Sequence, residues 1–193
     1  PFDLSNKVIC VTGASSGIGR QCAVSCSRMG ATVVLLARNE QRLHETLSIM
    51  DNPDKHVIIP VDLTEYATVE LVVKNIVSQV GRISGVLHCA GISTTLPLKL
   101  VTPEKLDEFF QANVFSAYNL TREVCKMGNF SKEGGSIVFF SSVMGKVGEN
   151  GKSLYGMTKG ALVSGTRSLA CELAKKKIRV NTVSPGVVIT PIN

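Results

Sequence analysis

The stretch that decides the fold runs from Val8 to Arg20 and reads VICVTGASSGIGR. Its apolar, β-branched first half predicts a buried strand, and a helical segment follows the glycines at 13, 17 and 19. Glycines let the backbone bend sharply and approach a pyrophosphate, whose charge is met by N–H groups at the start of a helix. The stretch therefore predicts a strand, a phosphate-binding turn and a helix, in that order.

Outward from this stretch, short apolar runs alternate with longer segments of helical period. The runs cover residues 7–12, 31–37, 56–61, 85–89, 136–141 and 178–183. Near-continuous apolar strands separated by segments of helix length are typical of parallel strands covered on both faces. Right-handed crossovers then predict a doubly wound, Rossmann-type α/β fold in three layers, as one domain over residues 1–193, with ligands at the carboxyl ends of the strands.

Two helix starts are legible in the sequence. Thr102 offers an N-cap before Pro103 and Glu104, and Thr64 with Glu65 offers a similar start after the third strand.

Composition limits the classes of protein that fit. The 193 residues carry 21 Lys and Arg against 15 Asp and Glu, a net charge of +6, which would suit an acidic partner or a phosphorylated cofactor. The basic run 175–179 contains no aromatic residue, so nucleic acid is not expected as a partner.

The six cysteines form no C-x-x-C pair, so no metal site is expected. Asp3 and Lys7 interrupt any N-terminal apolar run and no stretch is long enough to span a membrane, so we expect a cytoplasmic protein.

The glycine turn has rival interpretations. Its spacing is G-x-x-x-G-x-G rather than the dinucleotide fingerprint G-x-G-x-x-G, and residues 13–17 also match the G-x-S-x-G elbow of hydrolases. A hydrolase is disfavoured because no earlier strand–helix loop can supply a second oxyanion donor, and because His44, His56 and His88 all come early in the chain. A P-loop is excluded because no Gly-Lys-Ser/Thr is present.

The residues at the end of the second apolar run would contact the ribose of a bound dinucleotide. An acidic residue there would accept hydrogen bonds from a 2′-hydroxyl, whereas the sequence has Ala37 and then Arg38, whose guanidinium suits a 2′-phosphate. This favours NADP(H) over NAD(H). The alternative is that Arg38 is a solvated residue at a helix start, as we interpret Arg42.

A tyrosine and a lysine follow the fifth apolar run at helical spacing. Tyr155 and Lys159 are i and i+4, so they share one face of a helix, and an ammonium there can stabilise a phenolate. Both could also be ordinary surface residues. Three glycines inside this helix, at 156, 160 and 165, predict a close backbone approach to a ligand or another helix.

Asn113 is a polar side chain in an apolar stripe. Leu106, Phe110, Asn113 and Ala117 trace one face of the helix that starts at Thr102. A buried amide must be satisfied, so Asn113 either ties up backbone groups or holds a water chain.

In combination these motifs resemble the short-chain dehydrogenase/reductase family over essentially the whole chain. The turn 12–19 matches the family's T-G-x-x-x-G-x-G, and the step from Ser142 to the Y-x-x-x-K pair also matches. The resemblance implies that Asn113, Ser142, Tyr155 and Lys159 are catalytic. Patterns and resemblance together assign cofactor binding to Gly13, Ser15, Ser16, Gly17, Ile18, Gly19, Arg38, Asp62, Leu63, Ala90, Gly91, Tyr155, Lys159, Pro185, Gly186, Val188 and Thr190. Asp62 would contact adenine, or alternatively cap the next helix.

The chain departs from the family pattern in two places. The N-N-A-G motif after the fourth strand reads His88-Cys89-Ala90-Gly91, which puts the local hydrogen bonding in doubt. Family members also continue with another strand and a substrate-covering loop, so we expect the chain ending at Asn193 to be truncated or partly ordered, with the C-terminal strand and substrate loop missing.

The resemblance implies NADP(H)-dependent reduction of a carbonyl group to a secondary alcohol. Tyr155 would exchange a proton with the substrate oxygen, Lys159 would lower the phenol pKa and hold ribose hydroxyls, Ser142 would bind the substrate oxygen, and Asn113 would hold a water. A 3-oxoacyl thioester on an acyl carrier is the favoured substrate, ahead of sugars, steroids and small ketones, and the run 175–179 could dock the acidic carrier. A homodimer or homotetramer is expected through the helix 153–176.

Two alternatives from other classes stay open. One is a non-catalytic NADP(H)-binding sensor or scaffold. The other is a nucleotide-binding methyltransferase, which would leave Ser142, Tyr155 and Lys159 unexplained.

Overall fold

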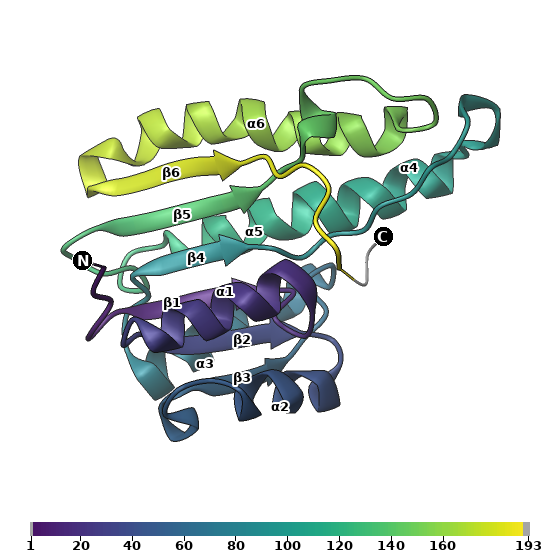
Figure 1. The fold of residues 1–193 in the computed structure, drawn as a ribbon. Coiled ribbons are helices and arrows are strands. Elements are labelled where there is room, and N and C mark those ends of the chain that lie inside the picture. The colour runs from purple at the N-terminus through teal and green to yellow at the C-terminus, as the bar shows by residue number, and fades with distance from the viewer. Residues whose placement is uncertain (1, 191–193) are drawn as a thin grey trace.

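The computed structural model describes residues 2–190 and has a parallel sheet at its centre (Figure 1). The six strands lie in the order β3-β2-β1-β4-β5-β6, and every neighbouring pair is parallel. They are β1 (Val8–Thr12), β2 (Thr32–Ala37), β3 (Val57–Pro60), β4 (Gly85–His88), β5 (Gly135–Phe140) and β6 (Ile178–Val183). Each predicted apolar run holds one strand, so the predicted Rossmann-type fold is confirmed. The strand order reverses between β1 and β4, which is where such sheets bind ligands.

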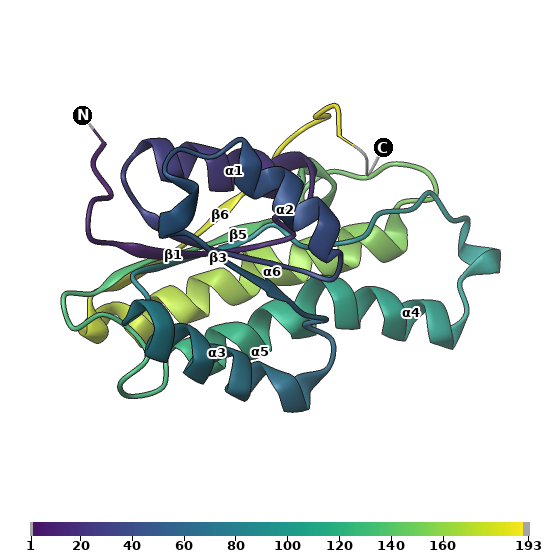
Figure 2. The same cartoon turned by 90° about the horizontal axis from the view of Figure 1, so that it is seen from below.

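Helices cover both faces of the sheet (Figure 2). They are α1 (Gly17–Arg28), α2 (Glu40–Ser48), α3 (Tyr66–Val80), α4 (Pro103–Phe110), α5 (Ser116–Val124) and α6 (Ser153–Leu173). α1 and α2 lie on one face, and the other four helices lie on the opposite face. None of the helices between residues 2 and 190 is long and apolar enough to cross a membrane.

The strands are apolar on both sides because each face is buried. Along β1, Val8 and Cys10 belong to the cluster under α3, α5 and α6, whereas Ile9 and Val11 belong to the cluster under α1 and α2. Alternate residues of a strand point to opposite faces, so a continuous apolar run fills two cores at once.

Both predicted helix starts are found in place, but only the one at Thr102 has the predicted cap. The Thr102 hydroxyl accepts a hydrogen bond from the N–H of Lys105 and caps α4, as expected. Thr64 caps nothing: its N–H and hydroxyl both donate to Asp62 Oδ1, at 2.9 and 2.7 Å, and α3 starts later, with Glu65 in the N-cap position. Asp62 closes a local turn instead of capping the helix, since its carboxylate satisfies Thr64 before the helix begins.

The predicted apolar stripe around Asn113 is also wrong in part. Leu106 is exposed and Phe110 is half-buried, whereas Phe109 is buried. The reason is a π-helical turn over Gln111–Phe115, between α4 and α5, which shifts the faces of the two helices relative to each other. Asn113 lies inside this turn and is 1% exposed.

Candidate active site

The glycine turn between β1 and α1 comes close to the segment after β4 and leaves the start of α1 without a side-chain cap. Gly13 and Gly17 have φ of +64° and +52°, a region that side chains disfavour, and a Cβ on Gly13 would lie 2.9 Å from Ala90 Cα. Ser16 is the N-cap residue of α1 but makes no capping hydrogen bond with its side chain, and no acidic residue lies in the first turn. The N–H groups at the start of α1 are therefore left without a side-chain acceptor, which suits a phosphate group.

A cavity of about 1090 Å³ opens at this turn, at the carboxyl ends of the strands. Its wall includes most of the predicted cofactor residues, namely Gly13, Ser15, Ser16, Gly17, Ile18, Gly19, Arg38, Asp62, Leu63, Ala90, Gly91 and Thr190. Figure 1 shows the segment after β6 crossing the strand ends toward this region. Thr190 Oγ1 in this segment is buried and has no hydrogen-bond partner among residues 2–190. The other predicted cofactor residues do not line the cavity: Tyr155, Lys159, Pro185, Gly186 and Val188.

Several lining residues were not anticipated from the sequence. Arg42 and Asn39 come from the start of α2, Tyr66 from α3, and Glu108 and Gln111 from α4 and the π-turn. Arg42 follows Arg38 by four residues, a spacing that could have indicated a shared face. The contribution of α4 and the π-turn had no local signal, because it depends on where these segments pack.

Two arginines near the turn have different surroundings. The Arg20 side chain has a structural role, because its guanidinium donates to Ser15 O at 2.7 Å and to Glu45 Oε2 at 2.9 Å. Arg38 is exposed, and its only ion pair within residues 2–190 is with Asp62, at 3.8 Å. Burial raises the pKa of Asp62, but hydrogen bonds from Thr64 and the charge of Arg38 outweigh it and lower the pKa. Arg38 is thus free to turn toward an anion in the cavity.

Tyr155 and Lys159 share one face of α6, as the spacing predicts. Lys159 Nζ lies 5.6 Å from the centre of the Tyr155 ring and donates to Phe140 O at 2.9 Å. Lys159 is buried, which lowers its pKa to about 8. Burial raises the pKa of the Tyr155 phenol, and a hydrogen bond with Ser142 acts in the other direction without reversing it. The net direction is therefore opposite to the one that the resemblance implies.

Ser142 reaches Tyr155 because the turn after β5 packs closely on α6. A Cβ on Gly156 would lie 2.8 Å from Met144 O, and one on Gly145 would lie 2.9 Å from the carbonyl carbon of Lys159. The predicted close approach is therefore found at Gly156. It is absent at Gly165, where a Cβ would meet nothing within 4 Å.

The Asn113 amide ties up backbone groups, one of its two anticipated roles. Its Oδ1 accepts from the N–H of Ile92 at 2.7 Å, and its Nδ2 donates to Ile92 O and to Thr158 Oγ1, both at 3.0 Å. A Cβ on Gly91 would lie 2.9 Å from Asn113 Oδ1 and 3.4 Å from Lys159 Nζ. Since Gly91 lines the cavity, Asn113 and Lys159 lie at its border.

The departure from the family motif at His88 and Cys89 is accommodated by packing. The His88 ring stacks on Phe139 with centroids 4.6 Å apart, and Nε2 lies 2.9 Å from Thr121 Oγ1. Burial lowers the pKa of His88 to about 3, so the ring is neutral. Cys89 hydrogen-bonds with Cys22, which raises the pKa of the Cys89 thiol. No group of His, Cys, Asp or Glu within residues 2–190 could hold a metal ion.

This architecture defines the class of Rossmann-type dinucleotide-binding proteins: a doubly wound parallel sheet with a glycine turn and a cavity where the strand order reverses. The family model for short chain dehydrogenases matches residues 7–193. The chain therefore belongs to the short-chain dehydrogenase family of oxidoreductases, as the resemblance indicated.

Relatives of known sequence and structure agree with this assignment. An uncharacterized oxidoreductase of Staphylococcus epidermidis is 32% identical over 189 residues, covering 98% of this chain and 81% of that protein. The chloroplastic NADPH-dependent aldehyde reductase 1 of Arabidopsis thaliana is 34% identical, covering 98% of this chain and 68% of that protein. The crystal structure of 3-ketoacyl-(acyl-carrier-protein) reductase from Brucella melitensis complexed with NADH superposes with a TM-score of 0.91 at 29% identity, covering 98% and 79% of the two chains.

Proposed function

We propose that this chain is an NADP(H)-dependent oxidoreductase that reduces a carbonyl group to a secondary alcohol, with Tyr155 as the proton donor. The observation that carries the proposal is the meeting of Ser142, Tyr155 and Lys159 beside a cavity built on a glycine turn. The meeting of a serine, a tyrosine and a buried lysine at this place argues against a protein that only binds a nucleotide.

The residues around the cavity fit a dinucleotide. The uncapped start of α1 offers N–H groups to a pyrophosphate. Asp62 and Leu63 line the same cavity, and by the family resemblance Asp62 would contact the adenine. The orphaned hydroxyl of Thr190 offers a further hydrogen bond inside the cavity. When bound, the nicotinamide supplies a hydride.

Two cations support NADP(H) over NAD(H). Arg38 and Arg42 both line the cavity and both are exposed, so two guanidinium groups can approach a 2′-phosphate. Among the relatives, the Arabidopsis enzyme is named for NADPH, whereas the Brucella enzyme was crystallised with NADH.

The proton chemistry follows from burial and hydrogen bonding. Because burial raises its pKa, the Tyr155 phenol stays protonated at neutral pH and can donate its proton to a substrate oxygen. Ser142 would orient that oxygen. The Lys159 ammonium would stabilise the phenolate that donation leaves behind, with Asn113 holding Ile92 and Gly91 in place beside it.

The proposed substrate is a 3-oxoacyl thioester or a similar ketone, and the Brucella relative is named as a 3-ketoacyl-(acyl-carrier-protein) reductase. The lysines at 175–177 give no support to carrier docking at the site. They lie before the amino end of β6, whereas Tyr155 and the cavity lie at the carboxyl ends of the strands.

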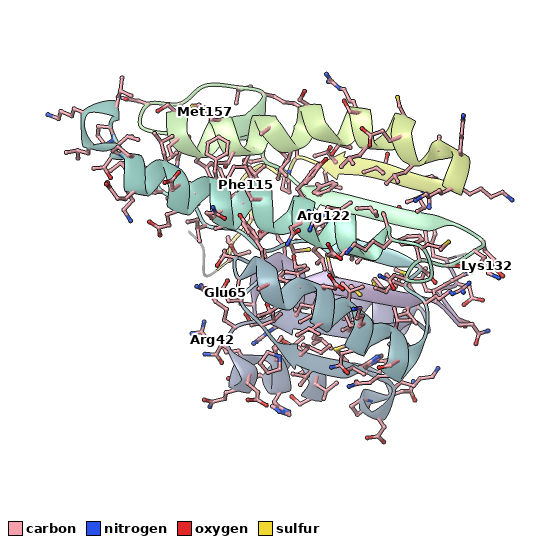
Figure 3. All side chains as sticks on the ribbon, turned by 180° about the vertical axis from the view of Figure 1, so that it is seen from behind. Arg42, Glu65, Phe115, Arg122, Lys132 and Met157 are labelled. Atoms are coloured by element: carbon pink, nitrogen blue, oxygen red, sulfur yellow. The ribbon has the colours of Figure 1, made fainter. Side chains whose placement is uncertain are left out.

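A homo-oligomer is also part of the proposal. Phe115, Tyr118 and Met157 are 44%, 55% and 58% exposed, and Figure 3 shows Phe115 and Met157 on the helical face away from α1 and α2. Exposed large apolar side chains on neighbouring helices are typical of subunit interfaces. Measurement of the mass in solution tests whether the protein is a homo-oligomer.

A cytoplasmic location is also proposed. The six free cysteines support it.

The test is a dehydrogenase assay with NADPH and NADH against a panel of ketones, aldehydes and acyl thioesters. The proposal expects oxidation of NADPH with at least one carbonyl and its near loss in Tyr155→Phe. A sensor or scaffold would bind NADPH without oxidising it across the panel. Failure to bind NADPH, together with binding of a methyl donor, would favour a methyltransferase.

A further inference from the structure

Three cysteines gather between α1 and the end of β4. Cys22 and Cys26 are i and i+4 on α1, so they share one face of that helix, and Cys89 directly follows β4. All three are partly buried and pack against the same core cluster, under α1 and α2. The thiols of Cys22 and Cys89 are joined by a hydrogen bond. The proposed reaction uses none of these thiols.

The two hydrogen-bonded thiols differ in how readily they lose a proton. The bond with Cys89 lowers the pKa of Cys22 more than burial raises it. The same bond, together with burial, raises the pKa of Cys89, and burial raises the pKa of Cys26 to about 11. Because the thiolate is the form that attacks an oxidant, Cys22 is the reactive member of this cluster, and Cys89 carries the proton between them.

The thiol pair adjoins the dinucleotide cavity. Cys89 is part of the cavity wall, beside Ala90 and Gly91. The cavity therefore gives a small oxidant a path to this part of the chain, and a dinucleotide bound there would close that path.

The glycine turn leaves little room for movement beside Cys89. A Cβ on Gly13 would lie 2.9 Å from Ala90 N and 3.1 Å from the carbonyl carbon of Cys89. The N–H of Ala90 also donates to Thr12 Oγ1 at 3.0 Å. A disulfide bond is about 2 Å long, so forming one would draw the two sulfur atoms closer together than a hydrogen bond holds them. Such a movement would displace α1 or the segment after β4, which adjoin the glycine turn on its two sides.

We propose that Cys22 and Cys89 are an oxidisable dithiol, which a hydroperoxide converts to a disulfide that weakens binding of the dinucleotide. In the first step the Cys22 thiolate attacks a peroxide oxygen: an S–O bond forms, the O–O bond breaks, and the leaving oxygen takes a proton and departs as water or an alcohol. In the second step the Cys89 sulfur attacks the Cys22 sulfenic acid: the S–S bond forms, the S–O bond breaks, and the hydroxyl group leaves with the Cys89 proton as water. The two sulfur atoms together lose two electrons, which reduce the peroxide.

The first step prepares the second. Oxidation removes the negative charge of Cys22, which is one cause of the raised pKa of Cys89, so the second thiol becomes easier to deprotonate. Transient disulfides of this kind in reducing compartments are typical of redox-sensing proteins. The effect on the dinucleotide rests on the proposed function, whereas formation of the disulfide does not.

The first experiment treats the folded, reduced chain with hydrogen peroxide and identifies the products by mass spectrometry after trypsin digestion without reductant. Cys171→Ser serves as the background, because Cys171 is exposed and could link two chains. Trypsin leaves the two α1 cysteines in peptide 21–28 and Cys89 in peptide 83–99. We expect these two peptides to be linked, with a mass two hydrogen atoms below the sum of the separate peptides.

Serine variants identify the members of the pair. Cys22→Ser and Cys89→Ser should each remove the link between the peptides. Cys26→Ser is the matched control, because it removes a thiol from the same helix face one turn further along, and it should keep the link.

The second experiment measures NADPH binding by fluorescence titration before and after oxidation. The dissociation constant should rise about tenfold on oxidation and return when dithiothreitol is added, and peroxide should leave it unchanged in Cys22→Ser. Saturating NADPH should slow formation of the linked peptides, because it covers the cavity wall at Cys89.

Three results would overturn the inference. They are oxidation of Cys22 without a link to peptide 83–99, a link that persists in Cys22→Ser, and equal dissociation constants of NADPH for the linked and the reduced protein. If the reduced chain binds no NADPH, the proposed function fails. The linked peptides would then still support the dithiol, and their absence would overturn it as well.

Discussion

Replacing Asn113 by alanine tests whether this amide supports the site through the backbone. The substitution removes three hydrogen bonds, two of them to the N–H and the carbonyl of Ile92. The third partner, Thr158 Oγ1, keeps its own bond to Tyr155 O at 2.8 Å. Two backbone groups thus lose their partners in a closely packed place, and at about 1 to 2 kcal/mol for each we expect a loss of about 3 kcal/mol in the free energy of unfolding.

Asn119, six residues further along, is the matched control. Its Nδ2 is buried without a hydrogen-bond partner among residues 2–190, so removing this amide deletes a group that already bears a desolvation cost. Asn119→Ala should change the free energy of unfolding by less than about 0.5 kcal/mol or should stabilise the protein.

Urea unfolding followed by far-ultraviolet circular dichroism measures both variants, with the slope m checked for constancy. A loss in Asn113→Ala below about 1 kcal/mol, or equal to that in Asn119→Ala, would refute the view that the amide is a structural clamp on the segment after β4. Asn113→Asp should be at least as destabilising at neutral pH, because a carboxylate oxygen would then face the carbonyl of Ile92.

Further predictions concern the reaction, the cofactor and the packing. Tyr155→Phe should lower kcat by about 10²-fold or more while NADPH affinity, measured by fluorescence titration, stays within a few-fold; turnover close to that of the wild type would remove the tyrosine from its role. The pKa of Lys159 falls from an ordinary value of 10.5 to about 8 on burial, so the unfolded chain binds the proton more tightly and stability should rise with pH across that interval. Chemical unfolding at several pH values should show this rise in the wild type and a flatter profile in Lys159→Met; parallel profiles would contradict the assignment. Arg38→Ala should raise the KM for NADPH about tenfold and that for NADH much less, and equal effects on both would argue against a 2′-phosphate contact. Gly156→Ala should lower the melting temperature, because the added Cβ would lie 2.8 Å from Met144 O, whereas the open site at Gly165 should gain stability from alanine; the reverse order would show that the turn after β5 does not pack on α6 as described.

The pattern of the chain predicted much of the fold because the relevant physics is local. A strand that is buried on both faces has to be apolar throughout, so β1 to β6 could all be recognised as apolar runs. The glycines of the turn were recognisable for a similar reason, since Gly13 and Gly17 have positive φ values that side chains disfavour. Tyr155 and Lys159 share a face because an uninterrupted helix repeats every three to four residues.

The same local reasoning failed where a contact with a distant segment decides the outcome. The stripe through Leu106 and Phe110 assumed an unbroken helix, and the π-turn around Asn113 interrupts it. Thr64 has the residue type of a cap, but the Asp62 carboxylate takes up both of its donors. These failures have one origin, because a residue type predicts what a side chain can do and not which partner reaches it first.

By itself the amino-acid sequence determined the order of strands and helices, the glycine turn and the family, since each depends on residues that are neighbours in the chain. Only the tertiary structure decided how the site is assembled and charged. It packs Asn113 against Ile92, buries Lys159 far enough to lower its pKa, and joins the thiols of Cys22 and Cys89 by a hydrogen bond. Burial and electrostatic interaction depend on distance in space, and segments far apart in the chain set those distances only when the sheet and its helices have packed.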